Sequence, residues 1–131
     1  MSADDLFAAA KAAMSHAHAP YSQFPVGAAV KTKAGAIHAG CNIENASYPE
    51  GWCAETTALG HMVMAGGGKV TEIAVVAEKM AKIMPCGGCR QRLAEFAAED
   101  AVLHLCDTDG VLETVPFSAV FPRGFSFEDG K

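Results

Sequence analysis

The sequence lacks an excess of basic residues and has no long uninterrupted apolar segment. Its 131 residues include 10 Lys and Arg against 15 Asp and Glu, which gives a formal net charge of -5. Proteins that bind a phosphate backbone or an anionic membrane surface normally present a basic field, so we expect neither nucleic acid nor membrane as a partner. No apolar run approaches the about 20 residues that a membrane-spanning helix needs.

The N-terminal residues do not have the pattern of a secretory leader, and the number of cysteines is odd. The N-terminus has Asp4 and Asp5 where a leader would have a basic start followed by an apolar run. The five cysteines include Cys86 and Cys89, whose C-x2-C spacing indicates metal binding in a chain that is not secreted. We therefore expect a soluble protein in a reducing, cytoplasmic environment.

Residue patterning predicts regular structure along most of the chain. Half of the residues are hydrophobic and 19% are charged, a balance typical of a globular protein, and the length fits a single domain over residues 1–131. Apolar periodicity, Gly and Pro breaks, and β-branched runs delimit the elements. The predicted helices are Asp4–His18, Cys53–Ala65 and Arg90–Ala98, and the predicted strands are Val26–Lys33, Ile37–Asn42, Val70–Ala77, Ala101–Cys106 and Val111–Val115.

The order of these elements indicates an α/β fold with a mixed sheet of five strands flanked by helices. The first two strands should form a hairpin, and the apolar strand Val70–Ala77 should lie centrally. The strand-helix-strand units around the second and third helices favour parallel neighbours. We expect an irregular tail over Pro122–Lys131.

Three cysteines and one glutamate fall where two of these strand-to-helix connections end. Zinc prefers a tetrahedron of thiolate and imidazole ligands, and a catalytic zinc keeps one position for water. Cys53, Cys86 and Cys89 could supply three ligands, each helped by a positive helix end. Glu55 follows Cys53 by two residues and could act as acid and base if the metal lies off the helix tip. On spacing alone, a structural zinc knuckle or a simple turn explains Cys86 and Cys89 equally well.

Several segments together resemble the cytidine deaminase family, in its small homotetrameric branch with three cysteine ligands. The resemblance covers nearly the whole chain and is carried by Phe24–Ala29, Gly40–Tyr48, Cys53–Glu55, Pro85–Gln91 and a late group of Pro122, Phe125, Glu128 and Asp129. It implies a three-layer α/β/α sandwich and a zinc-dependent hydrolase that deaminates cytidine and deoxycytidine in pyrimidine salvage. Zinc would lower the pKa of a water molecule that attacks C4 of the base, and Glu55 would shuttle the protons.

The resemblance also implies contacts to the nucleoside. Phe24 would line the pyrimidine pocket, and the backbone at Ala54 would help to hold the ring. Asn42 and Glu44, expected to be buried, would bind the ribose 3′-hydroxyl. Residues of adjacent subunits would complete the site, namely Ala46, Tyr48 and Phe125.

The sequence departs from that family next to the glutamate. Members with three cysteine ligands commonly carry Arg directly after it, whereas this chain has Thr56. Three thiolates on Zn²⁺ leave a net charge of about -1, which a guanidinium donating to sulfur would offset. We expect Arg90 to carry that load alone, so that Arg90→Ala is severely damaging and Thr56→Arg is tolerated.

Two other functions stay open. The chain could deaminate another cytosine-bearing small molecule, such as an aminonucleoside antibiotic, or it could be a non-catalytic module stabilised by zinc. An editing deaminase that acts on polynucleotides is disfavoured by the absence of a basic groove and surplus aromatic residues. Cys41 and Cys106 are expected to be core residues.

Overall fold

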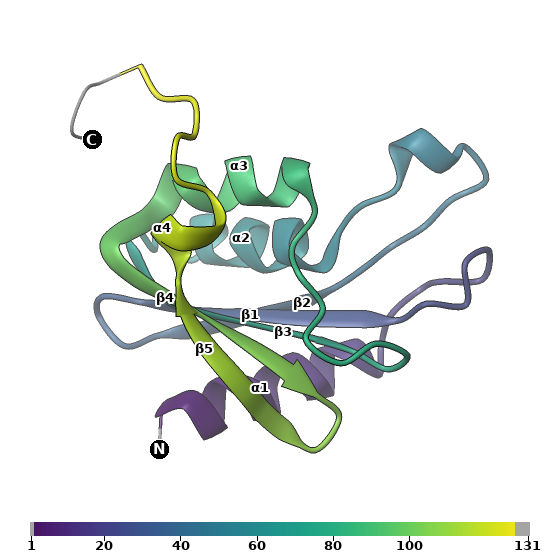
Figure 1. Ribbon diagram of the computed structural model, residues 1–131. Coiled ribbons are helices and arrows are strands. Elements are labelled where there is room, and N and C mark those ends of the chain that lie inside the picture. The colour runs from purple at the N-terminus through teal and green to yellow at the C-terminus, as the bar shows by residue number, and fades with distance from the viewer. Residues whose placement is uncertain (1, 128–131) are drawn as a thin grey trace.

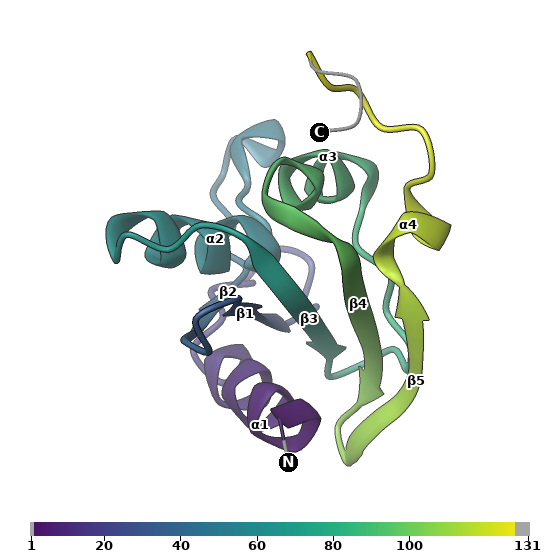
Figure 2. The same cartoon turned by 90° about the vertical axis from the view of Figure 1, so that its left-hand side faces the viewer.

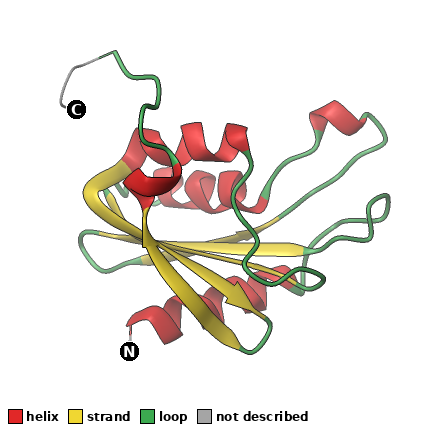
Figure 3. Ribbon diagram, in the orientation of Figure 1, coloured by secondary structure: helices red, strands yellow, loops and turns green. Residues whose placement is uncertain are grey.

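The computed structural model describes residues 2–127, and its elements form an α/β/α sandwich (Figures 1 and 3). Glu128 and Asp129 of the late family block lie outside the described residues. The helices are α1 (Ser2–Met14), the short 3-10 helix η1 (Tyr48–Glu50), α2 (Ala54–Met64), α3 (Gly87–Phe96) and α4 (Phe117–Val120). The strands are β1 (Val26–Thr32), β2 (Ile37–Cys41), β3 (Val70–Ala77), β4 (Ala97–Asp107) and β5 (Gly110–Pro116).

The five strands form one mixed sheet in the order β2-β1-β3-β4-β5. β1 and β2 pair as the predicted antiparallel hairpin, and β3 occupies the predicted central position. β3 and β4 pair in parallel across the α3 connection, as expected. The prediction of parallel neighbours around α2 is wrong. β2 and β3 run in the same direction but are not neighbours, because β1 lies between them and pairs antiparallel with both.

Helices cover both faces of the sheet. Figures 1 and 2 show α1 on one face and α2, α3 and α4 on the other. Side chains alternate accordingly along β3: Ile73 and Val75 pack in the core with α2 and α3, whereas Ala74 and Val76 pack with Leu6 of α1. Within residues 2–127 no helix combines the length and apolar character that a bilayer crossing requires.

The predicted ends of two helices differ from the structure. α1 stops at Met14 instead of reaching His18, because the Ser15 hydroxyl donates to the Ala12 carbonyl at 2.6 Å and the chain continues in single turns. α3 begins at Gly87 and ends at Phe96, after which Ala97 is already extended and pairs with Val70. The four-residue helix α4 was not predicted.

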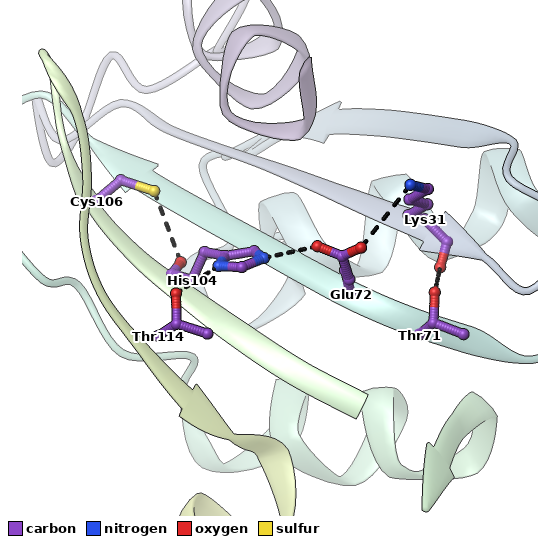
Figure 4. A network of polar contacts seen from close by, with 6 residues as sticks. All are labelled: Lys31, Thr71, Glu72, His104, Cys106 and Thr114. Atoms are coloured by element: carbon purple, nitrogen blue, oxygen red, sulfur yellow. Dashed lines mark hydrogen bonds and ion pairs between the residues drawn. The ribbon is translucent and has the colours of Figure 1, made fainter. Parts of the chain in front are cut away.

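A row of polar side chains crosses the α1 face of the sheet (Figure 4). The ring of His104, which is buried, lies 2.8 Å through Nε2 from Glu72 Oε1 and 2.8 Å through Nδ1 from Thr114 Oγ1. Lys31 Nζ lies 3.8 Å from the other carboxylate oxygen of Glu72. These contacts join β1, β3, β4 and β5. They also give both ring nitrogens of the buried imidazole a hydrogen-bond partner, and burying those nitrogens without partners would destabilise the fold.

The close approach of α2 to β2 depends on Gly40. A Cβ at Gly40 would lie 2.5 Å from the Ala58 nitrogen and 2.6 Å from the Thr57 Cβ, so only glycine lets the helix sit at this depth. Thr57 reinforces the contact, since its hydroxyl donates to the Cys41 carbonyl at 2.9 Å. The packing of α2 on the sheet fixes where that helix begins.

We expect Gly40→Ala to lower the free energy of unfolding by about 3 kcal/mol, because the added methyl group meets helix backbone that cannot move aside. Gly60→Ala is the matched control: its Cβ would meet nothing within 4 Å, and it lies inside α2. That substitution should raise the stability by about 1 kcal/mol through helix propensity. Urea denaturation measures both, and equal effects of the two substitutions would contradict the packing role of Gly40.

Candidate metal and catalytic site

Two helices begin at the same edge of the sheet. β2 and β3 run parallel to each other on either side of β1, so their carboxyl ends lie at one edge, and α2 and α3 follow them there. Cys53 is the N-cap of α2 and Cys86 is the N-cap of α3, both with extended backbone. Cys89 lies in the first turn of α3. The sequence prediction that cysteines open both helices is confirmed.

The three cysteine sulfurs converge at these helix starts. The Sγ atoms of Cys53, Cys86 and Cys89 all lie within 4.8 Å of one another, and those of Cys53 and Cys86 are 3.8 Å apart. Thiolates about 2.3 Å from a tetrahedral zinc ion are separated by about 3.8 Å. The donor set therefore fits zinc with three protein ligands and one remaining corner.

The start of α2 favours the charged form of the Cys53 thiol. The unpaired N–H groups at a helix start carry a partial positive charge, which stabilises a thiolate. A hydrogen bond from Cys89 lowers the pKa of the Cys53 thiol to about 6, and the Coulomb attraction of Arg92 acts in the same direction. The donor in that hydrogen bond, Cys89, has a raised pKa for the same reason and because it is buried.

Glu55 lies next to this cluster, in the first turn of α2. Its side chain is 5% exposed, and its Oε1 lies 3.6 Å from Cys89 Sγ. Burial raises the pKa of the Glu55 carboxyl, and the nearby Cys53 charge adds to the shift. Cys53 is the N-cap of α2, whereas Glu55 lies inside its first turn. Although the two residues are close in the sequence, their side chains can therefore reach the metal site from different directions. This arrangement provides an acid and base group beside a metal site.

A cavity of about 170 Å³ opens onto the cluster. Its lining includes two residues that the sequence interpretation singled out for nucleoside contacts, Asn42 and Ala54, together with Cys53, Glu55 and Cys86. Sequence reasoning missed the other lining residues, which are Val26, Ile83 and Met84. Ile83 and Met84 could have been found from their position directly before Pro85 and Cys86.

Asn42 and Glu44 are partly exposed, so the expectation that they are buried is wrong. The Asn42 side chain ties the end of β2 to the start of β1, since its Oδ1 accepts from the Val26 N–H and its Nδ2 donates to the Phe24 carbonyl. Glu44 accepts hydrogen bonds from the backbone of Tyr21 and Ser22 and from the Ser22 hydroxyl. The Ser22 hydroxyl is the main cause that lowers the pKa of Glu44.

The three residues expected to act in neighbouring subunits do not line the cavity of their own chain. Ala46 lies in an exposed loop, Tyr48 is 72% exposed and Phe125 is 68% exposed. Tyr48 borders a separate cavity of about 190 Å³ with Glu44. Phe125 borders another cavity together with Glu95 of α3, and its ring contacts Phe127.

The two arginines of α3 are used differently from the sequence expectation. Arg90 donates from Nε to the Pro85 carbonyl at 2.8 Å and from Nη1 to the Val120 carbonyl at 3.1 Å. These bonds direct its guanidinium to backbone carbonyls, so the expected donation to sulfur lacks geometric support. Arg92, which the sequence interpretation overlooked, donates to the Thr56 hydroxyl at 3.2 Å. Its position one helical turn after Gly88 could have indicated that its side chain lies against the first turn of α3.

Comparison with known proteins agrees with this geometry. The family described as "Cytidine and deoxycytidylate deaminase zinc-binding region" matches residues 1–105. A protein named cytidine deaminase from Sporosarcina psychrophila is 40% identical over 129 residues, which cover 98% of this chain and 95% of that protein. The chain belongs to the cytidine and deoxycytidylate deaminase family. As a member of it, the chain is an enzyme of the zinc-dependent deaminase class, and the resemblance inferred from its motifs is confirmed.

Solved cytidine deaminases share the fold as well. The cytidine deaminase from Burkholderia pseudomallei superposes with a TM-score of 0.85 and 41% identity, covering 92% of this chain and 97% of that one. The enzyme from Mycobacterium tuberculosis gives a TM-score of 0.83 at 32% identity, covering 94% and 96%. The α/β/α sandwich with a mixed five-stranded sheet is therefore the cytidine deaminase fold.

We expect Cys89→Ser to abolish stoichiometric zinc binding, because a buried hydroxyl cannot replace a thiolate ligand. Cys41→Ser is the matched control, since Cys41 lies outside the three-sulfur cluster. Elemental analysis of purified protein after dialysis should give one zinc per chain for the control and far less for Cys89→Ser. Equal zinc content in the two variants would contradict the assignment of the cluster.

Proposed function

We propose that this enzyme hydrolytically deaminates cytidine and deoxycytidine to uridine and deoxyuridine with release of ammonia. The observation that carries the proposal is the buried carboxyl of Glu55 beside three converging sulfurs at the bottom of a cavity. The similar proteins named cytidine deaminase support the choice of substrate. Cys53, Cys86 and Cys89 would hold zinc, which supplies Lewis-acid activation of water when it is bound.

Glu55 would move the protons of the reaction. Its carboxylate would take a proton from the attacking water and deliver it to N3 of the base. It would then take the remaining proton from the hydroxyl now on C4 and pass it to the amine, so that the C4–N bond breaks, ammonia leaves and the C4 carbonyl forms. The raised pKa of this carboxyl suits a group that must both accept and release a proton near neutral pH. Its burial keeps other water from competing for that proton.

Substrate recognition would be shared among the residues named from the family resemblance. Phe24 would line the pyrimidine pocket, and the backbone at Ala54 would hold the ring, a role supported by the place of Ala54 in the cavity wall. Asn42 and Glu44 would bind the ribose 3′-hydroxyl. Both side chains are already fixed by hydrogen bonds to backbone groups, which orients them before a ligand arrives.

The active unit would be a homotetramer of single-domain chains, each domain covering residues 1–131. Ala46, Tyr48 and Phe125 would then reach the nucleoside in a neighbouring subunit. Their exposure supports this role, as does the exposure of other large apolar side chains, namely Trp52, Val63 and Met64. We further propose that the enzyme works in the cytoplasm, in pyrimidine salvage.

Replacing Glu55 tests the proposed chemistry. We expect Glu55→Gln to lower kcat for cytidine by about 10²–10⁴-fold at unchanged zinc content, because the amide cannot transfer the protons. Loss of cytosine absorbance measures the rate with cytidine, deoxycytidine and free cytosine. Glu99→Gln, which removes an exposed carboxylate, should keep the wild-type rate.

Full zinc loading without turnover of any cytosine nucleoside by the wild-type chain would contradict the proposal and favour a non-catalytic zinc module. Turnover only of other cytosine-bearing molecules would instead favour the alternative substrate class. Rapid turnover by Glu55→Gln would remove Glu55 from its proton-transfer role.

The mass of the assembly and the KM of one variant test whether neighbouring subunits share each active site. We expect light scattering to give the mass of four chains, and Phe125→Ala to raise KM for cytidine about tenfold, the loss expected when one packed aromatic contact is removed. Wild-type KM in a Phe125→Ala tetramer, or full activity of a dilute monomer, would contradict shared sites.

A further inference from the structure

The side chain of Arg92 runs back over the first turn of α3 towards the three-cysteine cluster. Its Nη1 donates to the Thr56 hydroxyl on α2 at 3.2 Å. A Cβ at Gly88 would lie 3.5 Å from Nη1 and 3.8 Å from Cζ, so the guanidinium lies against the glycine between the cysteine ligands Cys86 and Cys89. This direction is the one that a long side chain takes on a helix, towards the N-terminus and the residue four positions earlier.

A cation at this place needs an anionic partner. The N-terminal turn of a helix carries a partial positive charge, which disfavours a guanidinium. The first turn of α3 contains no acidic residue of its own. The Glu55 carboxyl and the Cys53 thiol both feel the attraction of Arg92. The metal site supplies the excess negative charge, because three thiolates exceed the charge of one Zn²⁺ by about one unit.

The Thr56 hydroxyl lies between the guanidinium and a sulfur. Thr56 Oγ1 accepts from Arg92 and lies 4.0 Å from Cys89 Sγ, within reach of an O–H···S hydrogen bond. A hydroxyl that accepts from a cation becomes a better donor, so its proton can point to the thiolate. The two residues thus connect α3 and α2 at the metal site through one charge and one hydroxyl.

We propose that Arg92, acting through Thr56, balances the excess negative charge of the three thiolates and thereby sets how tightly the chain holds zinc. Arg92 is a positioning residue, because it contacts neither the metal nor the substrate. This role rests on zinc binding to the three cysteines, as in the proposed function, but it does not require that cytidine is the substrate.

Zinc competition with a chromophoric chelator at one fixed pH tests this role without measuring turnover. We expect Arg92→Gln and Thr56→Val each to weaken zinc binding by about 10–100-fold, the loss typical when a partner of a metal ligand is removed. The double variant should lose about as much as Arg92→Gln alone, because the two residues act in series. A fully additive double variant would overturn the connection through Thr56.

Two further variants separate local charge from general effects. Lys11→Gln removes one positive charge from the exposed surface of α1, on the other face of the sheet, and should leave zinc affinity unchanged. Thr56→Arg combined with Arg92→Gln should restore most of the affinity, because it supplies a guanidinium from α2. In cobalt-substituted protein, the sulfur-to-metal charge-transfer band should shift in Arg92→Gln and stay in place in Lys11→Gln.

Wild-type zinc affinity and an unshifted cobalt band in Arg92→Gln would overturn the proposal. Equal losses in Arg92→Gln and Lys11→Gln would also overturn it, since they would indicate a general effect of net charge. Weak zinc retention in Arg92→Gln together with no turnover of cytosine nucleosides by the wild type would support the role of Arg92 while contradicting the proposed function.

Discussion

The meeting of two helix N-termini at one edge of the sheet is the constraint on which the site depends. Cys53 and Cys86 cap α2 and α3, and the extended backbone at each cap turns the sulfur towards the other helix. Neither helix alone could place three thiolates within 4.8 Å of one another. The same helix starts supply partial positive charge to the thiolates, so geometry and electrostatics favour the same location.

The sheet determines where those two helices begin. β2 and β3 end at the same edge because both pair antiparallel with β1, which lies between them. The depth of α2 is set by the missing side chain at Gly40. Once α2 sits at that depth, Glu55 is buried beside Cys89 and not exposed to solvent. A packing detail of the hairpin thus determines the environment of the proton-transferring group.

Much of the fold and the core of the site could be predicted from local sequence signals. The strand Val70–Ala77 and the helix after Cys53 have strong periodicity and clear glycine breaks, and both match the structure closely. The insertion of β1 between β2 and β3 could not be read locally, because strand order depends on long-range pairing. The start of β4 was missed since Ala97 and Ala98 favour helix by propensity alone.

The charge partners of the site could not be assigned from adjacency in the sequence. Arg90 lies next to Cys89 in the chain, yet its guanidinium reaches the Pro85 and Val120 carbonyls, whereas Arg92 is directed towards Thr56. Which arginine faces the cluster depends on helix phase and on α4, an element that residue patterns did not predict. Adjacency in the sequence was a poor guide to adjacency in space.

X-ray absorption at the zinc edge tests the central claim most directly. For the zinc-loaded wild-type chain we expect three sulfur scatterers at about 2.3 Å and one oxygen or nitrogen scatterer at about 2.0–2.2 Å, as three thiolates and one exchangeable position require. A shell of four sulfurs, or of fewer than three, would contradict an open-cornered site formed by Cys53, Cys86 and Cys89.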